Sequence, residues 1–209
     1  MRCAIPKSGP APKKMFIALR TYWHNLEEFA PGAWRSNQPD TKRFEAYAAM
    51  GISTILNLRG VAKQPHYLFE VEACEKLGLT LVNSQMAARR APTKRELNNL
   101  LKAFSEIERP FLLHCKSGAD RTGLAAALYL MIYEGKSLAD AKKQLSFRYL
   151  HIRRSNTGIL DHFLDMYAAS AAESPIRIDE WIKSEYEPAA LKKSFAEKQK
   201  SLRPWQGWR

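Results

Sequence analysis

Short apolar segments alternate with longer helical segments between residues 33 and 133, and this alternation constrains the fold more than any other feature. We expect strands at Ala33–Gln38, Ile52–Leu58, Leu79–Asn83 and Phe111–His114. We expect helices from Asp40 or Thr41 to Met50, over His66–Leu77 with Gly78 behind it, from a Thr93–Glu96 capping box to Ile107, and over Leu124–Tyr133. The pattern predicts an α/β fold whose central, mainly parallel sheet of about four to five strands has helices on both faces.

After Gly135 the sequence becomes helical, and no linker separates a second domain. The expected helices are Ser137–Phe147, Gly158–Ala172, Ile178–Tyr186, and Pro188 to about Lys200. We therefore divide the chain into an N-terminal arm with a short helix (1–30), a main domain (31–172), and a helical C-terminal extension with a tail (173–209). The short helix would run through Phe16, Leu19, Tyr22, Trp23 and Leu26.

Composition narrows the partners but does not select one. The chain has 209 residues, is 45% hydrophobic and carries 33 Lys and Arg against 21 Asp and Glu, so its formal net charge is +12. Such a sequence is globular, has no apolar run long enough to span a bilayer, and favours anionic partners: nucleic acid, a lipid surface or phosphorylated molecules.

The cysteines indicate a reducing compartment. Cys3, Cys74 and Cys115 are an odd, sparse set without zinc-finger spacing, which argues against a disulfide framework. The apolar run Met15–Leu19 is too short for the hydrophobic core of a signal peptide. We therefore expect a cytoplasmic protein. We expect Cys74 in the core, with a protective disulfide to Cys115 as a minor alternative.

Chemistry is concentrated between the strand Phe111–His114 and the helix that follows it. The loop reads Cys115-Lys116-Ser117-Gly118-Ala119-Asp120-Arg121. A loop that leads from a strand into a helix N-terminus presents backbone N–H groups and the positive end of the helix dipole, which suit a phosphate. These donors and a guanidinium would stabilise the Cys115 thiolate and make it a nucleophile. Arg121 can bind two phosphoryl oxygens, and the Thr122 hydroxyl can reach the sulfur.

This segment resembles the signature H-C-x5-R-[ST] of the cysteine-dependent protein tyrosine phosphatase superfamily, in its compact, bacterial, dual-specificity-like form. His114, Cys115, Arg121, Thr122 and Gly123 carry the match. The resemblance implies a phosphatase fold, a phosphocysteine intermediate on Cys115, phosphate binding by the loop, and no metal or other cofactor. His114 and Gly123 would support the loop structurally.

The acid that the resemblance requires is absent from its usual place. Family members carry an aspartate upstream of the cysteine, but here that stretch reads NSQMAARRAPT, with no Asp or Glu between Glu75 and Glu96. Asp120, within the loop, is the remaining candidate, as in the myotubularin and Sac phosphoinositide phosphatases. The alternative is an outward-facing Asp120 that only complements the helix dipole.

The remaining candidate residues would bind substrate. The backbone N–H groups of Ser117, Gly118 and Ala119 would cradle the phosphate, Lys116 would add charge, and Arg89 and Arg90 would form the rim, unless they are merely solvated. A run without acidic residues, from Ala141 to Leu160, would supply further walls and includes Lys142, Lys143, Arg148, Arg153 and Arg154. We expect His151 and Arg153 to approach the site from that side.

Three functions stay open at this stage. The leading one is a tyrosine or dual-specificity type phosphomonoesterase. Its partner would be a phosphorylated protein or, alternatively, an inositol phosphate or phospholipid head group, and free phosphate or sulfate would also fit the loop. The second is a non-catalytic phosphate-binding module. RNA ranks last because no RNA-binding motif appears, so nucleic acid is disfavoured as a partner. Peripheral membrane contact is an open alternative, and the sequence does not indicate the oligomeric state.

Overall fold

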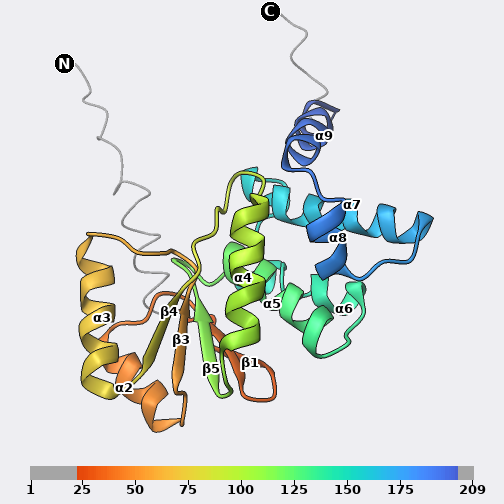
Figure 1. Cartoon of the computed structure of the whole chain (residues 1–209). Helices are drawn as coiled ribbons and strands as arrows, with labels where there is room; N and C mark the ends of the chain where they lie inside the picture. The colour runs from red at the N-terminus through yellow and green to blue at the C-terminus, as the bar shows by residue number, and fades with distance from the viewer. Residues whose placement is uncertain (1–22, 202–209) are drawn as a thin grey trace, which may run out of the picture.

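Figure 1 shows the computed structural model of the chain, of which residues 23–201 are described below. Five strands form one sheet in the order β1-β2-β5-β3-β4. Their bounds are β1 Glu27–Ala30, β2 Ala33–Ser36, β3 Thr54–Asn57, β4 Thr80–Asn83 and β5 Phe111–His114. All neighbours pair in parallel except β1 and β2, which form an antiparallel hairpin. The predicted α/β class with a mainly parallel sheet is confirmed.

Helices cover both faces of this sheet (Figure 1). The α-helices are α2 Thr41–Ala49, α3 Pro65–Leu77, α4 Lys94–Glu106, α5 Asp120–Tyr133, α6 Leu138–Lys142, α7 Ile159–Glu173, α8 Ile178–Ser184 and α9 Pro188–Ser201. Two short 3-10 helices, η1 Phe147–Tyr149 and η2 Asn156–Gly158, connect α6 to α7.

The local signals in the sequence explain where several helices begin and end. Asp40 caps α2, because its side chain accepts a hydrogen bond from the Arg43 backbone N–H. The predicted capping box of Thr93 and Glu96 opens α4. Gly78 ends α3 with a left-handed φ of +67°, a conformation that glycine adopts without steric cost.

The two faces have separate cores that meet across β5. Alternate residues of a strand point to opposite faces, so Leu112 packs with α2 and α3 while Phe111 and Leu113 pack with α4 and α5. The larger core includes the fully buried α5 segment from Leu124 to Leu128. Every residue of β5 is 0% exposed, so the strand that precedes the predicted loop is the most deeply buried of the sheet.

The C-terminal helices share the larger core. Trp181 and Ile182 of α8 and Leu191 of α9 are buried in it, and the Tyr186 hydroxyl donates to the Pro92 carbonyl at 2.7 Å. The expected C-terminal extension therefore packs on the face that carries α4, α5 and α7. The predicted domain boundaries stay predictions, and residues 202–209 of the predicted tail lie outside the described residues.

The structure corrects several expected elements. The short helix predicted in the N-terminal arm does not extend over Trp23 to Leu26, which are not helical. Its earlier residues lie outside the described part of the chain. Glu27–Ala30, which we assigned to the arm, form β1. The single helix expected over residues 137–147 is wrong, because α6 ends at Lys142 and the chain turns through η1. Helix α5 begins at Asp120, four residues before its expected start. No helix among residues 23–201 is long and apolar enough to cross a membrane.

Candidate active site

The predicted phosphate loop connects the central strand β5 to the N-terminus of α5 (Figure 1). Cys115 follows β5 directly and is 1% exposed, and Arg121 stands in the first turn of α5. The fold therefore brings the predicted nucleophile and the predicted phosphate-binding arginine to the positive end of one helix dipole. This is the strand–loop–helix arrangement that the sequence predicted for residues 114–122.

Several groups stabilise the anionic form of Cys115. Burial alone favours the neutral thiol, but the positive charge of Arg121 and hydrogen bonds from Thr122 and from the Ser117 backbone lower its pKa overall. The Thr122 hydroxyl is buried without a hydrogen-bonding partner among the described residues, and its effect on the thiol lowers the pKa of Cys115. The roles predicted for Arg121, Thr122 and Ser117 stay predictions.

A buried arginine that sequence reasoning missed supports the loop from below. Arg35 of β2 is 0% exposed, donates to the Gly118 carbonyl at 2.6 Å and to the Gln144 carbonyl at 3.1 Å, and lies 3.5 Å from the centre of the Tyr149 ring. Burial lowers its pKa to about 10, which leaves it charged at neutral pH. It joins the loop to the segment that follows α6.

Two glycines allow other segments to approach the loop closely. Gly118 has a φ of +72°, and a Cβ there would stand 2.7 Å from the Ser36 carbonyl oxygen. At Gly123, on α5, a Cβ would stand 2.6 Å from the Gln144 carbonyl oxygen. The absence of side chains at both positions therefore sets how tightly β2 and the end of α6 pack against the loop.

His114 has a structural partner that lies far away in the sequence. Its Nε2 is 2.6 Å from Oε1 of Glu70 on α3, and both side chains are 0% exposed. Burial disfavours the Glu70 carboxylate, but hydrogen bonds from His114 and Gln38 offset this and lower its pKa. His114 thus anchors the start of the loop to α3, in line with its predicted supporting role.

Asp120 does not face outward into solvent. Its Oδ1 lies 2.7 Å from Nδ1 of His151, and Nε2 of His151 lies 2.6 Å from Oδ2 of Asp161 on α7. The expectation that His151 approaches the site is confirmed. The alternative of an exposed Asp120 that only complements the helix dipole is wrong, because its side chain is 20% exposed and hydrogen-bonded.

An open cavity of about 900 Å³ lies over the loop. Lys116, Ser117, Asp120 and Arg121 line it on one side. The segment Met86–Arg90, between β4 and α4, lines the other side. Arg89 and Arg90 are therefore rim residues, as predicted, although Arg90 also forms a bidentate ion pair with Glu96 at 2.7 and 2.8 Å. The segment 86–90 contributes no carboxyl group, so Asp120 is the acidic residue at this cavity.

The predicted basic wall from Lys142 to Arg154 is wrong. Lys142 pairs with Asp165 at 2.8 Å, Lys143 with Asp140 at 2.7 Å, Arg148 with Glu27 at 2.6 Å and Arg153 with Asp165 at 3.0 Å. These residues, like Arg154, do not line the cavity over the loop. The sequence run contains no acid, but β1, α7 and the start of α6 supply acids that neutralise most of its charge locally.

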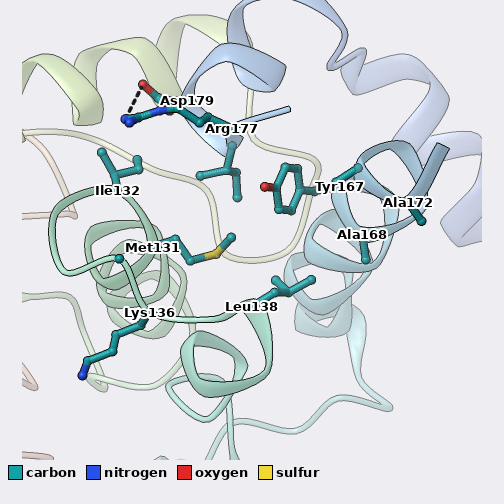
Figure 2. Close-up of a pocket in the computed structure, with 12 residues that line it drawn as sticks. Met131, Ile132, Lys136, Leu138, Tyr167, Ala168, Ala172, Arg177 and Asp179 are labelled. Atoms are coloured by element: carbon teal, nitrogen blue, oxygen red, sulfur yellow. Dashed lines mark hydrogen bonds and ion pairs between the residues drawn. The ribbon is translucent and has the colours of Figure 1, made fainter. Parts of the chain in front are cut away.

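A second cavity, of about 460 Å³, lies on the opposite end of α5 (Figure 2). It is lined mainly by apolar side chains, among them Met131, Ile132 and Tyr167. Figure 2 shows the Arg177–Asp179 ion pair at its edge, with a distance of 3.0 Å. Its lining includes no cysteine or histidine, so the loop cavity is the candidate active site.

Two further residues hold the site together and were not predicted. Asn25 is 8% exposed, and its amide donates to the carbonyls of Ser117 at 2.8 Å and Tyr149 at 3.0 Å. Asp161, on α7, holds His151. Both lie far from the loop in sequence. Asp161 stands among mainly apolar residues, which is a weak signal, and the sequence around Asn25 offers none. Cys74 is buried in the smaller core, and both it and Cys115 are free thiols, so the alternative disulfide is wrong.

Comparisons with known proteins agree with this geometry. The model of a family described as "Swiss Army Knife protein, DSP-PTPase phosphatase domain" matches residues 31–155. A search of the curated proteins gave no match.

Solved structures of several phosphatases are similar in fold. The core catalytic domain of the PP-IP phosphatase SIW14 from S. cerevisiae is 18% identical, with a TM-score of 0.54 over 71% of this chain and 91% of that chain. A putative phosphatase from Shewanella putrefaciens CN-32 is 14% identical, with a TM-score of 0.59 over 73% and 95%. P. aeruginosa TpbA is 20% identical, with a TM-score of 0.50 over 83% and 91%.

Proposed function

The chain belongs to the DSP-PTPase phosphatase domain family of Swiss Army Knife proteins, and we propose that it hydrolyses phosphomonoesters through a phosphocysteine on Cys115. The single observation that carries the mechanism is the position of Cys115, buried at the end of β5, at the base of a loop that leads into α5 and places Arg121 in its first turn. The family establishes a cysteine-dependent phosphatase. The residue roles given below are our proposal.

In the first step the Cys115 thiolate attacks phosphorus as the bond to the leaving oxygen breaks. Arg121 and the backbone N–H groups of residues 116–119 hold the phosphoryl oxygens and balance the charge that spreads over them. Asp120 donates a proton to the leaving oxygen, which departs as an alcohol or phenol.

In the second step water attacks the phosphorus of the phosphocysteine and the P–S bond breaks. Asp120 accepts a proton from the attacking water, and the electron pair of the bond returns to the sulfur. The Thr122 hydroxyl donates to that sulfur and thereby stabilises the departing thiolate. Inorganic phosphate then leaves the loop.

The first experiment measures hydrolysis of p-nitrophenyl phosphate and of a phosphotyrosine peptide. Cys115→Ser should abolish turnover of both, whereas Cys74→Ala, which alters the other described thiol, should retain it. Turnover by Cys115→Ser would overturn the mechanism. If the wild-type protein binds phosphate or vanadate in the loop but hydrolyses no substrate, the non-catalytic binding module becomes the better account.

The cations around the cavity favour a second candidate within the same reaction class. Lys116, Arg121, Arg89 and Arg90 all line a cavity of about 900 Å³, which is wide enough for a ring that carries more than one phosphate. Arg89 makes no ion pair with any residue in the range 23–201, so its charge is available to such a substrate. We therefore include inositol phosphates and phosphoinositide head groups as candidate substrates beside phosphotyrosine.

A substrate panel discriminates between these two classes. If polyphosphorylated rings are preferred, Arg89→Ala should raise KM for an inositol polyphosphate and leave KM for p-nitrophenyl phosphate unchanged. Arg95→Ala is the matched control, because Arg95 is exposed on α4 but does not line the cavity. Equal effects of the two variants would remove the support for the second candidate. The free thiols support a reducing, cytoplasmic location for either substrate.

A further inference from the structure

Asp120 is one end of a hydrogen-bonded chain that leads from the cavity into the protein interior. His151 lies in the middle and is 2% exposed, and Asp161 closes the chain with a side chain that is 11% exposed. The two nitrogen–oxygen distances are 2.7 and 2.6 Å, in the range of charge-assisted hydrogen bonds. Only the Asp120 end reaches the cavity over the loop.

The two contacts favour the charged form of His151. When both carboxylates are ionised they only accept hydrogen bonds, so bonds to both ring nitrogens then require an N–H at each, which is the imidazolium form. Burial opposes that charge, but the hydrogen bonds and the charges of Asp120 and Asp161 overcome burial and raise the pKa of His151 to about 9. At neutral pH, Nδ1 of His151, which contacts Asp120, therefore carries a proton.

No other charged group near these hydrogen bonds takes the place of His151 between Asp120 and Asp161. Arg153 approaches Asp161, with Nε 3.8 Å from Oδ1, but it is 62% exposed and makes its closer contact with Asp165. On the cavity side the neighbouring charges are Lys116 and Arg121, which bind phosphate in the proposed mechanism. His151 is thus the group that joins the two carboxylates.

The backbone that carries His151 adopts an unusual conformation. Leu150, the preceding residue, has a left-handed φ of +63°, which is unfavourable for a residue with a Cβ. The turn ends η1 and is accompanied by a hydrogen bond from the His151 backbone N–H to the Ser146 carbonyl at 3.2 Å. The chain therefore places the imidazole between α5 and α7 at a conformational cost.

We propose that His151, oriented by Asp161, is the positioning residue that holds Asp120 toward the leaving group and supplies the proton that Asp120 delivers. The proposal rests on the proposed function, in which Asp120 protonates the leaving oxygen. It also explains how this chain works without a carboxyl group in the segment 86–90.

The proton balance closes over the two steps. The negative charge of a bound phosphate favours the neutral form of the nearest carboxyl group, so the proton moves from Nδ1 of His151 to Asp120 and from there to the leaving oxygen. Nε2 keeps its N–H and its bond to Asp161. When water attacks the phosphocysteine, its proton passes through Asp120 back to Nδ1, and the imidazolium is restored.

The test uses His151→Asn in the full chain. An asparagine amide can still donate a hydrogen bond to Asp120, but it cannot give up a proton. The test reads the first step in a single turnover. Release of phenol from phenyl phosphate, a poor leaving group, should slow about 10- to 100-fold, because proton donation in the transition state contributes at least this much. Release of 2,4-dinitrophenol from 2,4-dinitrophenyl phosphate, whose leaving group needs no proton, should keep a rate constant within about 3-fold of wild type. Vanadate affinity should not change.

Two outcomes would overturn the proposal: an equal loss of the first-step rate constant on both substrates, which indicates a structural role, or no loss on either. Asp161→Asn is the second variant, which keeps an acceptor for Nε2 but removes the charge. It should show the same dependence on leaving group with a smaller loss on phenyl phosphate.

A measurement independent of turnover separates this proposal from the proposed function. NMR titration of the His151 imidazole, assigned by its disappearance in His151→Asn, should give a midpoint well above 7 that falls in Asp161→Asn. A midpoint below 6.5, the ordinary pKa of histidine, would refute the claim that His151 supplies the proton, even if Cys115 is the nucleophile. Conversely, hydrolysis by Cys115→Ser would defeat the proposed function and leave the titration result standing.

Discussion

The buried pair of Glu70 and His114 permits a quantitative test of what holds the loop in place. Glu70→Gln replaces a carboxylate that accepts two hydrogen bonds, from His114 at 2.6 Å and from the Gln38 amide at 3.0 Å. Glutamine offers one acceptor and one donor. Gln38 cannot reverse its amide to match, because its Oε1 accepts from Arg59 at 2.7 Å. The glutamine oxygen must therefore face Gln38 and its amide must face His114, whose Nε2 accepts only in the tautomer that carries the proton on Nδ1.

The expected magnitude follows from these contacts. Hydrogen bonds to a charged group contribute about 1.5–3 kcal/mol each, against about 0.5–1.5 kcal/mol for bonds between neutral groups. Since Glu70→Gln converts two bonds of the first kind into two of the second, the free energy of unfolding should fall by about 2–3 kcal/mol. For a chain of this size, that corresponds to a decrease in Tm of about 4–12 °C.

Urea denaturation followed by tryptophan fluorescence measures this change, with Glu72→Gln as the control on the exposed side of the same helix. The difference should also depend on pH. The pKa of Glu70 is lowered in the folded state, so its contribution is complete above its unfolded pKa of about 4.3 and disappears as the pH falls through the folded value. A loss no larger than that of Glu72→Gln at pH 7 would refute the reasoning.

Three further predictions concern the loop. Gly118→Ala should lower stability by more than about 2 kcal/mol and abolish turnover, because its Cβ would meet the backbone of β2. Gly135→Ala, with φ +60° and no atom within 4 Å of its Cβ, should cost only about 1 kcal/mol. Thermal denaturation compares the two variants. Iodoacetamide at pH 7 should alkylate Cys115 in preference to Cys74, whose pKa is raised to about 12 by burial and by Glu70, and peptide mass spectrometry would contradict this if Cys74 reacted first. Arg35→Met should raise KM for p-nitrophenyl phosphate several-fold, because the Gly118 carbonyl loses its donor at 2.6 Å, and unchanged kinetics would contradict a supporting role.

Features encoded within a few neighbouring residues could be predicted from the sequence. The strand Phe111–His114 has the bounds that its apolar run predicted, and the capping box of Thr93 and Glu96 opens α4 as expected. The signature at Cys115 placed the loop at the end of that strand and at the start of a helix. In each case the determining interactions lie within one strand, turn or loop.

The missed features depend on contacts between distant residues. Strand β1 contains Glu27 and Glu28 and lacks an apolar alternation, so only its pairing with β2 defines it. The helix expected after Ser137 stops at Lys142, because the chain must turn there to bring His151 to Asp120. Glu70 was counted among the helical residues of α3 because its partner, His114, lies 44 positions away.

Because β5 lies at the centre of the sheet, the nucleophile at its end and the proton supply at His151 belong to parts of the fold that differ in local stability. Strand β5 is flanked by β2 and β3, and its amide protons can exchange with solvent only through global unfolding. His151 follows η1, a short segment in which Phe147 is 73% exposed, and we expect its amides to exchange before those of a central strand. If η1 opens first on heating, esters with poor leaving groups should be the first substrates that the protein ceases to hydrolyse, because their first step needs the proton from His151.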